Sequence, residues 1–126
     1  MKRKRTSEQA STRRMMNGWT LDVANELMSA RGLSRREAFQ QAWAYRRLLE
    51  ALAQGVVEFQ YRKMNGEVRR ARGTLCRGVS EQFDSYVPKT ERKAAVEDYP
   101  KLEFAYWDLD REAFRCFSAE NILVNS

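Results

Sequence analysis

The chain has 126 residues, a formal net charge of +6 and an isoelectric point near 9.6, and 43% of its residues are hydrophobic. This length holds one domain with a short appendage. Because the sequence contains no histidine and only two cysteines, histidine-based catalysis, histidine metal sites and a four-cysteine zinc site within one chain are excluded. No apolar run approaches the ~18 residues of a membrane span, so we expect no membrane segment, no secretory signal and a cytoplasmic location.

The positive charge is concentrated in the first two thirds of the chain. Residues 1–54 hold 11 Lys or Arg against 5 Asp or Glu, and residues 55–76 hold 5 against 2. Residues 77–126, in contrast, hold 7 against 10. This asymmetry suits a polyanionic partner such as nucleic acid, or an acidic protein surface, although a soluble protein with a basic tail would have the same balance.

Residues 1–18 are predicted to form a flexible basic arm. The first 14 residues contain six basic side chains and one acidic one, with almost no apolar surface to bury, so they are not expected to fold alone. A basic run near the start could contact nucleic-acid phosphates, or serve solubility only. This run consists of Lys2, Arg3, Lys4 and Arg5.

Residues 19–54 are predicted to form a helical hairpin. Apolar residues recur at helical spacing up to Arg31, with Thr20 as the N-cap and Gly32 as a left-handed stop. A capping box formed by Ser34 and Glu37 then predicts a second helix over about residues 35–53.

The second helix has an unusually wide apolar stripe, which indicates burial against a substantial surface. The stripe comprises Ala38, Ala42, Tyr45, Leu49 and Leu52, widened by Phe39, Trp43 and Leu48. Its aromatic residues are interpreted as core or interface anchors. The candidates for a partner interface are Phe39, Trp43 and Tyr45. A helix-turn-helix that places this helix in a DNA groove is a weaker alternative, because a third supporting helix is missing.

The stretch from residue 56 to residue 75 predicts a β-hairpin that turns at Asn65-Gly66. A two-residue turn would bury two arginines, so we expect a three-residue loop, residues 64–66, with Gly66 left-handed in a bulge. This register places Val57, Phe59 and Ala71 on the inner face. It leaves a solvent-exposed outer face of Gln60, Arg62, Arg70 and Arg72.

The rest of the chain predicts three further strands. A long loop is expected over residues 77–101, with one helical turn near residues 91–97. Strands then follow at 102–107, 113–117 and 122–124, with a 3₁₀ turn before the last. The prediction is therefore an α+β fold, in which the helical hairpin packs on a five-stranded antiparallel β-barrel of the SH3-like or Sm-like type over residues 55–126.

Two stretches of the chain resemble the WYL-type domain and its small Sm-like or SH3-like relatives, which are common in phages and mobile elements. These stretches are VEFQYRKMNGEVRRARGTL and YWDLDREAFRCFSAENILV. Residues 106–109 stand where that domain has its namesake run, and residues 115–122 resemble the arginine-containing strand and turn that follow. The resemblance implies a ligand-sensing or nucleic-acid-binding module in regulators of transcription and phage defence. It implies ligand contacts at Tyr61, Arg70, Arg72, Trp107 and Arg115.

Charge, fold and resemblance together predict a small, non-enzymatic nucleic-acid-binding accessory or regulatory protein, encoded by a phage or mobile element, without a cofactor. Its DNA or RNA would lie on the basic arm and beside Arg62, Arg70 and Arg72, with Tyr61 or Trp107 as stacking aromatics. The alternative is a protein-interaction module, such as a phage-encoded inhibitor or a self-assembling factor. No catalytic constellation is recognised, because acid pairs such as Asp108 and Asp110 fit turn geometry.

Overall fold

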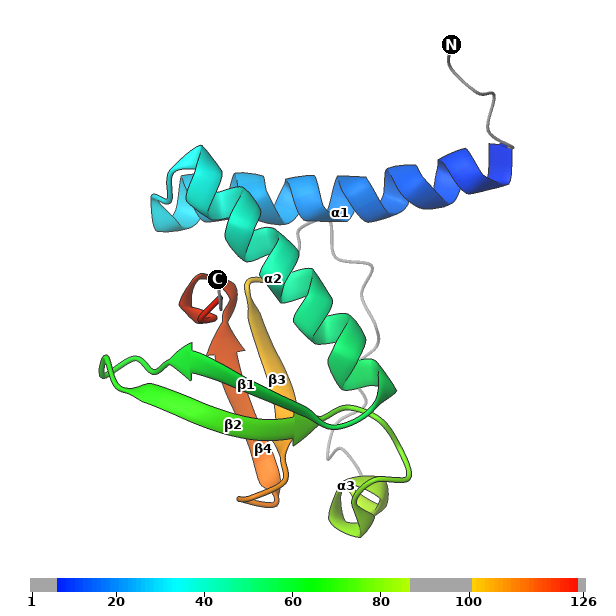
Figure 1. Cartoon of the computed structure of the whole chain (residues 1–126), viewed down its shortest axis with the longest axis vertical. Helices are drawn as coiled ribbons and strands as arrows, with labels where there is room; N and C mark the ends of the chain where they lie inside the picture. Colours follow the sequence, from blue (N-terminus) through cyan, green and yellow to red (C-terminus); the bar gives the residue numbers. More distant parts are fainter. Residues whose placement is uncertain (1–6, 87–100, 125–126) are drawn as a thin grey trace.

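The computed structural model describes residues 7–86 and 101–124, and the side chains of its first helix from Gly18 onward. Figure 1 shows two long helices that cross on one side of an antiparallel sheet with the strand order β1-β2-β3-β4. The α+β prediction is confirmed. The elements are α1 (Ser7–Arg31), α2 (Arg35–Gln54), β1 (Val57–Arg62), β2 (Val68–Thr74), α3 (Glu81–Ser85), β3 (Glu103–Asp108), β4 (Ala113–Ser118) and the 3₁₀ turn η1 (Ala119–Asn121).

Helix α1 begins at Ser7, so the prediction that it begins at Thr20 is wrong. Thr20 lies inside the helix, where only 3% of its surface is exposed, and it is not the N-cap. No proline between residues 7 and 19 stops the helix from extending toward the N-terminus. Residues 7–18 therefore belong to α1. The predicted phosphate contacts of the basic arm lie outside the described residues: Lys2, Arg3, Lys4 and Arg5.

The turn between α1 and α2 follows the predicted chemistry. Gly32 has a φ of 69°, the left-handed value that ends a helix at low cost only for glycine. The Ser34 hydroxyl accepts a hydrogen bond from the Glu37 backbone N–H at 3.2 Å and donates one to the Glu37 carboxylate at 2.8 Å. This cap starts α2 at the predicted residue, and the helix ends at Gln54, one residue beyond the prediction.

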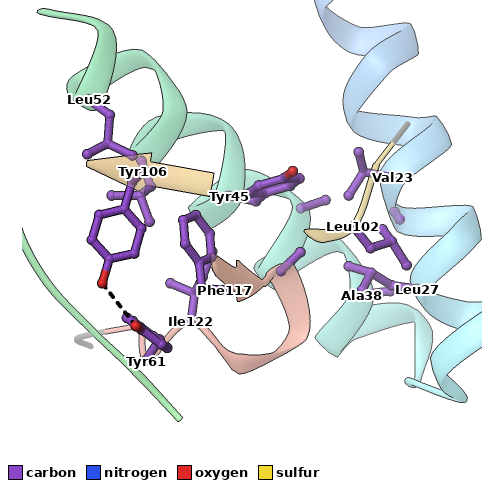
Figure 2. Close-up of a cluster of buried hydrophobic side chains, with 14 of the residues drawn as sticks. Val23, Leu27, Ala38, Tyr45, Leu52, Tyr61, Leu102, Tyr106, Phe117 and Ile122 are labelled. Atoms are coloured by element: carbon purple, nitrogen blue, oxygen red, sulfur yellow. Dashed lines mark hydrogen bonds between the residues drawn. The ribbon is translucent and has the colours of Figure 1, made fainter. Parts of the chain in front are cut away.

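Helix α2 covers one part of the inner face of the sheet with the buried side chains of Ala38, Ala42, Tyr45, Leu48 and Leu52. Figure 2 shows Tyr45 in the core, beside Phe117 from β4. The Tyr45 hydroxyl donates to the Lys101 carbonyl at 2.7 Å, and burial raises the pKa of Tyr45. Because Tyr45 is only 1% exposed, its predicted place in a partner interface is wrong.

The β1–β2 hairpin has the predicted register. Phe59 is paired with Ala71 and Val57 with Gly73, and Gly66 has a φ of 90°. Lys63 and Glu67 close the three-residue loop, because the Lys63 N–H donates to the Glu67 carbonyl at 2.8 Å. The inner face of the hairpin joins the core, as predicted.

The fifth strand expected at residues 122–124 is reduced to a single bridge between Ile122 and Tyr61, with one further bond from the Leu123 N–H to the Gln60 carbonyl at 2.9 Å. The Ile122 carbonyl is taken by a side chain instead of a strand, since Gln41 Nε2 on α2 donates to it at 2.9 Å. Over the described residues the sheet is four-stranded and open. The five-stranded closed barrel is therefore corrected to this simpler sheet.

A second aromatic cluster lies on the outer side of β3. Trp107 contacts Phe83 on the short helix α3, Phe114 on β4 and Tyr86, with ring centroids 5.1–6.2 Å apart. Helix α3 has no counterpart in the sequence prediction, and the helical turn predicted near residues 91–97 lies outside the described residues. Trp107 is 5% exposed in this cluster, so it is not available for stacking on a base.

Among the described residues, no helix has both the length and the apolar character that a membrane crossing requires.

Replacing Gly73 by alanine is expected to destabilise the fold, because the new Cβ would overlap Tyr106 Cδ2 and lie 3.1 Å from the Trp107 carbonyl oxygen. Overpacking of this kind costs about 1–3 kcal/mol. Urea denaturation measures the loss, and Gly18→Ala is the matched control, because nothing lies within 4 Å of a Cβ at Gly18. Equal stability of the Gly73 variant and the wild type would contradict this packing.

Candidate functional site

A hollow of about 380 Å³ opens where the inner face of the sheet is not covered, between the tip of the β1–β2 hairpin and β4. Tyr61 and Phe117 contribute apolar surface to it, and Glu103 is its one carboxylate among the described lining residues. The lining also includes five cationic side chains: Arg62, Lys63, Arg69, Arg111 and Arg115. We call this feature the cationic hollow.

Strand alternation turns Arg69 and Arg115 toward the inner face. Arg69 lies two residues before Ala71 in β2, and Arg115 lies two residues before Phe117 in β4. Ala71 and Phe117 are both buried in the core, and alternate residues of a strand share a face. The inner face is therefore apolar where α2 covers it and cationic where it is open.

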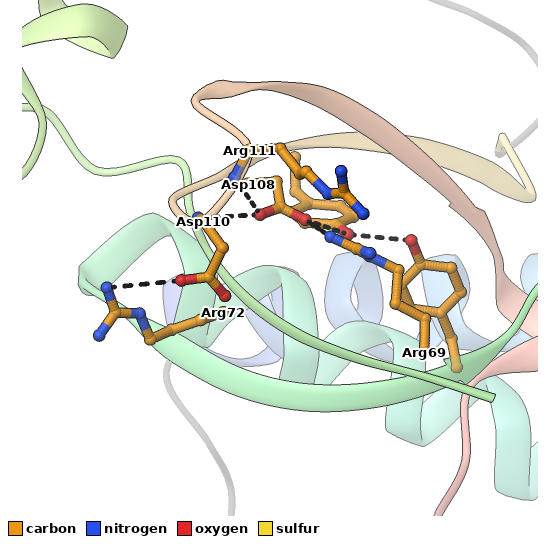
Figure 3. Close-up of polar contacts among 7 residues, drawn as sticks. Arg69, Arg72, Asp108, Asp110 and Arg111 are labelled. Carbon is orange, nitrogen blue, oxygen red and sulfur yellow. Dashed lines mark hydrogen bonds and ion pairs between the residues drawn. The ribbon is translucent and has the colours of Figure 1, made fainter.

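Asp108, at the end of β3, holds Arg69 from behind (Figure 3). The carboxylate is fully buried, and its Oδ2 accepts hydrogen bonds from the Arg69 guanidinium and from the Tyr106 hydroxyl, the latter at 3.3 Å. Its Oδ1 accepts from the backbone N–H groups of Asp110 and Arg111, both at 3.0 Å. A single carboxylate thus fixes both the β3–β4 turn and the arginine.

The ionised form of the Asp108–Arg69 pair is favoured. Burial by itself raises the pKa of Asp108, but the hydrogen bonds from Arg69 and from the Arg111 and Asp110 backbone outweigh it, so the pKa lies below its ordinary value. The hydrogen bond with Asp108 likewise raises the pKa of Arg69. Arg69 is 18% exposed, and its Nε is buried without a hydrogen-bond partner among the described residues. Its guanidinium is therefore fixed in position but not fully satisfied.

The outer face of the hairpin is less cationic than the sequence suggested. Arg70 and Arg72 are exposed there, as predicted. However, Arg72 is paired across the strands with Glu58, and its Nη2 lies 3.8 Å from the Asp110 carboxylate. These two carboxylates offset most of the positive charge of the outer face.

The predicted site residues therefore divide into three groups. Arg62, predicted on the outer face, lines the cationic hollow together with Arg115, whereas Arg70 and Arg72 lie on the outer face. The two predicted stacking aromatics, Tyr61 and Trp107, are corrected: Tyr61 is 4% exposed, and its hydroxyl lies 2.9 Å from that of Tyr106.

Sequence reasoning missed three of the five cationic residues of the hollow: Lys63, Arg69 and Arg111. A usable signal existed for Arg69. The same register that removes Arg70 and Arg72 from the inner face places Arg69 on it, beside Ala71. Lys63 and Arg111 lie in turns, where strand alternation gives no direction.

The predicted partner interface is retained only in part. Phe39 is half-buried and packs against the core, and Trp43 is 44% exposed. The Arg46 guanidinium lies 5.2 Å from the centre of the Trp43 ring. Trp43 also borders a shallow hollow of about 330 Å³ with Leu123 and Val124 at its rim.

The fold defines the class of the protein: a small domain with two long helices followed by a four-stranded antiparallel sheet. A family model described as WYL_2, Sm-like SH3 beta-barrel fold, matches residues 45–123, and the chain therefore belongs to the WYL_2 family. This confirms the resemblance inferred from the sequence. No curated protein and no solved structure matches the chain.

Over the part of the chain that the structure describes, no group of three or more Asp, Glu or Cys residues is arranged to hold a metal ion. The chemistry that the hollow offers is instead the binding of an anion by guanidinium and ammonium groups.

Asp108→Asn is expected to lower the free energy of unfolding at neutral pH by about 2–4 kcal/mol, because it leaves Arg69 without its buried counter-charge. Since the pKa of Asp108 is depressed in the folded state, its contribution is present above the unfolded value, near 4, and is lost as pH falls through the folded pKa. Urea denaturation from neutral to acidic pH should therefore show the gap between wild type and variant closing at the acid end. A gap that does not depend on pH would contradict this account.

Proposed function

We propose that this chain is a small, non-enzymatic nucleic-acid-binding protein with an accessory or regulatory role, which holds phosphate groups in the cationic hollow. The observation that supports the proposal best is the gathering of five cationic side chains from the hairpin tip, β2, the β3–β4 turn and β4 around one concavity. A solvated strand face would place arginines along one strand. Here, in contrast, cationic side chains from separate parts of the sheet line the same hollow.

The electrostatic balance favours a phosphate ligand. Two carboxylates belong to the hollow, Glu103 in its lining and Asp108 behind Arg69, and a third, Glu67, lies 3.6 Å from Lys63. Five cations against three carboxylates leave an excess of positive charge. Guanidinium groups bind phosphate oxygens through paired hydrogen bonds, and the release of counterions from nucleic acid adds to the affinity.

Base stacking on Tyr61 and Trp107 is not part of this proposal, because both rings are buried. The proposal therefore rests on backbone contacts, which are expected to tolerate many sequences. Whether DNA or RNA is the natural partner is decided by comparing single- and double-stranded forms of both. The phage or mobile-element origin, the cytoplasmic location and the lack of catalysis stay predictions.

The double variant Arg111→Ala/Arg115→Ala is expected to weaken the binding of single-stranded DNA or RNA about tenfold or more. It should also reduce the slope of log affinity against log salt by about 1.4, or about 0.7 for each lost phosphate contact. Fluorescence anisotropy at several salt concentrations measures both quantities.

The matched control is Arg70→Ala/Arg72→Ala, which removes the same charge from the outer face of the same sheet. It is expected to reduce affinity only about threefold and to leave the salt slope almost unchanged. Equal losses of affinity in the two double variants would show that the hollow is not the binding site.

The second candidate is a protein-interaction role, favoured by the exposure of Trp43 on α2. Large exposed aromatic residues are typical anchors of interfaces. The partner considered is a second copy of the chain, which would bury Trp43 together with the neighbouring Val124, 39% exposed.

Sedimentation velocity separates this candidate from the first. If the chain self-associates through this surface, the wild type sediments as a dimer and Trp43→Ala as a monomer. Gln40→Ala, on the same face of α2, serves as a control. A wild type that stays monomeric over the micromolar range would contradict the second candidate.

A further inference from the structure

The cationic hollow has the size of a small-molecule site and not that of a long groove. Its volume of about 380 Å³ is near the lower end of the ~300–1,000 Å³ that such sites span, so it has room for about one nucleotide. The hairpin tip bounds one side, where Arg62 Nη1 donates to the Gly66 carbonyl at 2.9 Å. An internal stretch of a strand would have to enter and leave this small hollow, whereas a strand end needs to enter it only once.

The guanidinium groups of the hollow come from three different parts of the sheet, an arrangement that suits one anion better than an extended nucleic-acid strand. Arg69 comes from β2, Arg111 from the β3–β4 turn and Arg115 from β4. Asp108 binds Arg69 from behind and the Arg111 backbone at 3.0 Å, so one buried carboxylate orients two of the three residues. The buried Arg69 Nε has no hydrogen-bond partner among the described residues.

We propose that the cationic hollow recognises a phosphate monoester at the end of a nucleic-acid strand in preference to an internal phosphodiester. The inference rests on the proposed function and names the chemical group that the site selects. A monoester carries about −1.5 to −2 charges at pH 7 and three terminal oxygens, whereas a diester carries a single charge. With the Asp108 carboxylate, Arg69, Arg111 and Arg115 carry a net charge of +2 (three positive charges less one), which matches the charge of the monoester. The three guanidinium groups also supply donors for its three terminal oxygens.

Glu103 gives the ligand a direction within the hollow. Its carboxylate repels a phosphate, and it lies 3.5 Å from Arg31 on the α1 side of the sheet. The phosphate therefore binds at the end of the hollow formed by Arg69, Arg111 and Arg115, and the remaining chain of the ligand leads out through the opening. The shared chemistry is a terminal phosphate, whether on a 5′ end, a 3′ end or a free mononucleotide.

The pH dependence of binding reports on the protonation state of the phosphate in the ligand. The second proton of a phosphate monoester binds with a pKa of about 6. The chain contains no histidine, the side chain that ordinarily titrates between pH 5 and 8. The charged and titratable groups that face the phosphate are the three arginines, Lys63 and Arg62 from the hairpin tip, Glu103 from β3, Tyr61 from β1 and Cys116 from β4.

The test uses the full chain and single-stranded oligonucleotides of about ten residues with a 5′-phosphate, a 3′-phosphate or hydroxyl groups at both ends. Fluorescence anisotropy should show about tenfold tighter binding of one phosphorylated end near pH 7.5. This preference should fall about fourfold near pH 5.5, as the phosphate takes up its second proton. A nucleoside monophosphate should compete with the phosphorylated oligonucleotide, and the corresponding nucleoside should not.

Arg115→Gln and, independently, Arg111→Gln should abolish the preference for the phosphorylated end, with circular dichroism confirming that each variant folds. Arg70→Gln, an exposed strand arginine on the outer face, should keep it. Equal affinity for all three ends, with binding still weakened by the hollow variants, would overturn end recognition and leave the proposed function standing. If no oligonucleotide binds at low salt, both fail, and binding of the mononucleotide alone would overturn recognition of a strand end.

Discussion

The buried carboxylate of Asp108 is the interaction on which both the sheet and the site depend. It accepts hydrogen bonds from two backbone N–H groups of the β3–β4 turn, from Tyr106 and from Arg69 on β2. Strands β2 and β3 are joined by only two residue pairs in the described sheet, so this side-chain link bridges a weak part of it. A buried charge is tolerated only when it is paired and fully hydrogen-bonded, and this requirement fixes Arg69 at the base of the hollow.

The register of the β1–β2 hairpin could be predicted because the cost of burying charged side chains excludes a two-residue turn and favours a three-residue loop. The two-residue turn would place Arg70 and Arg72 on the inner face, and the observed pairing of Phe59 with Ala71 avoids this. The same argument leaves one arginine, Arg69, on the inner face, and an inner arginine needs a counter-charge. Asp108 was recognised from the sequence as a turn former, which it is, but its second partner comes from a strand 39 residues away along the chain.

Three features differ from what the strand and helix patterns of the sequence predict. Helix α1 extends back to Ser7 although no amphipathic pattern marks its first half. Trp107 alternates to the outer side of β3, as its position requires, yet α3 covers it with Phe83. The last residues form only a single bridge with β1, and the Ile122 carbonyl accepts a hydrogen bond from Gln41 on α2. For Trp107 and for the last residues the partner is distant in sequence, so local propensity alone gives the wrong exposure or the wrong element.

The central claim is that phosphate binds on the open inner face of the sheet and not on its outer face. Arginine Nε–Hε resonances in an NMR titration with a single-stranded oligonucleotide test it most directly, because each guanidinium reports separately. The account predicts that the signals of Arg69, Arg111 and Arg115 shift together and saturate at one stoichiometry, while those of Arg70 and Arg72 stay near their free positions. Shifts confined to Arg70 and Arg72 would contradict it.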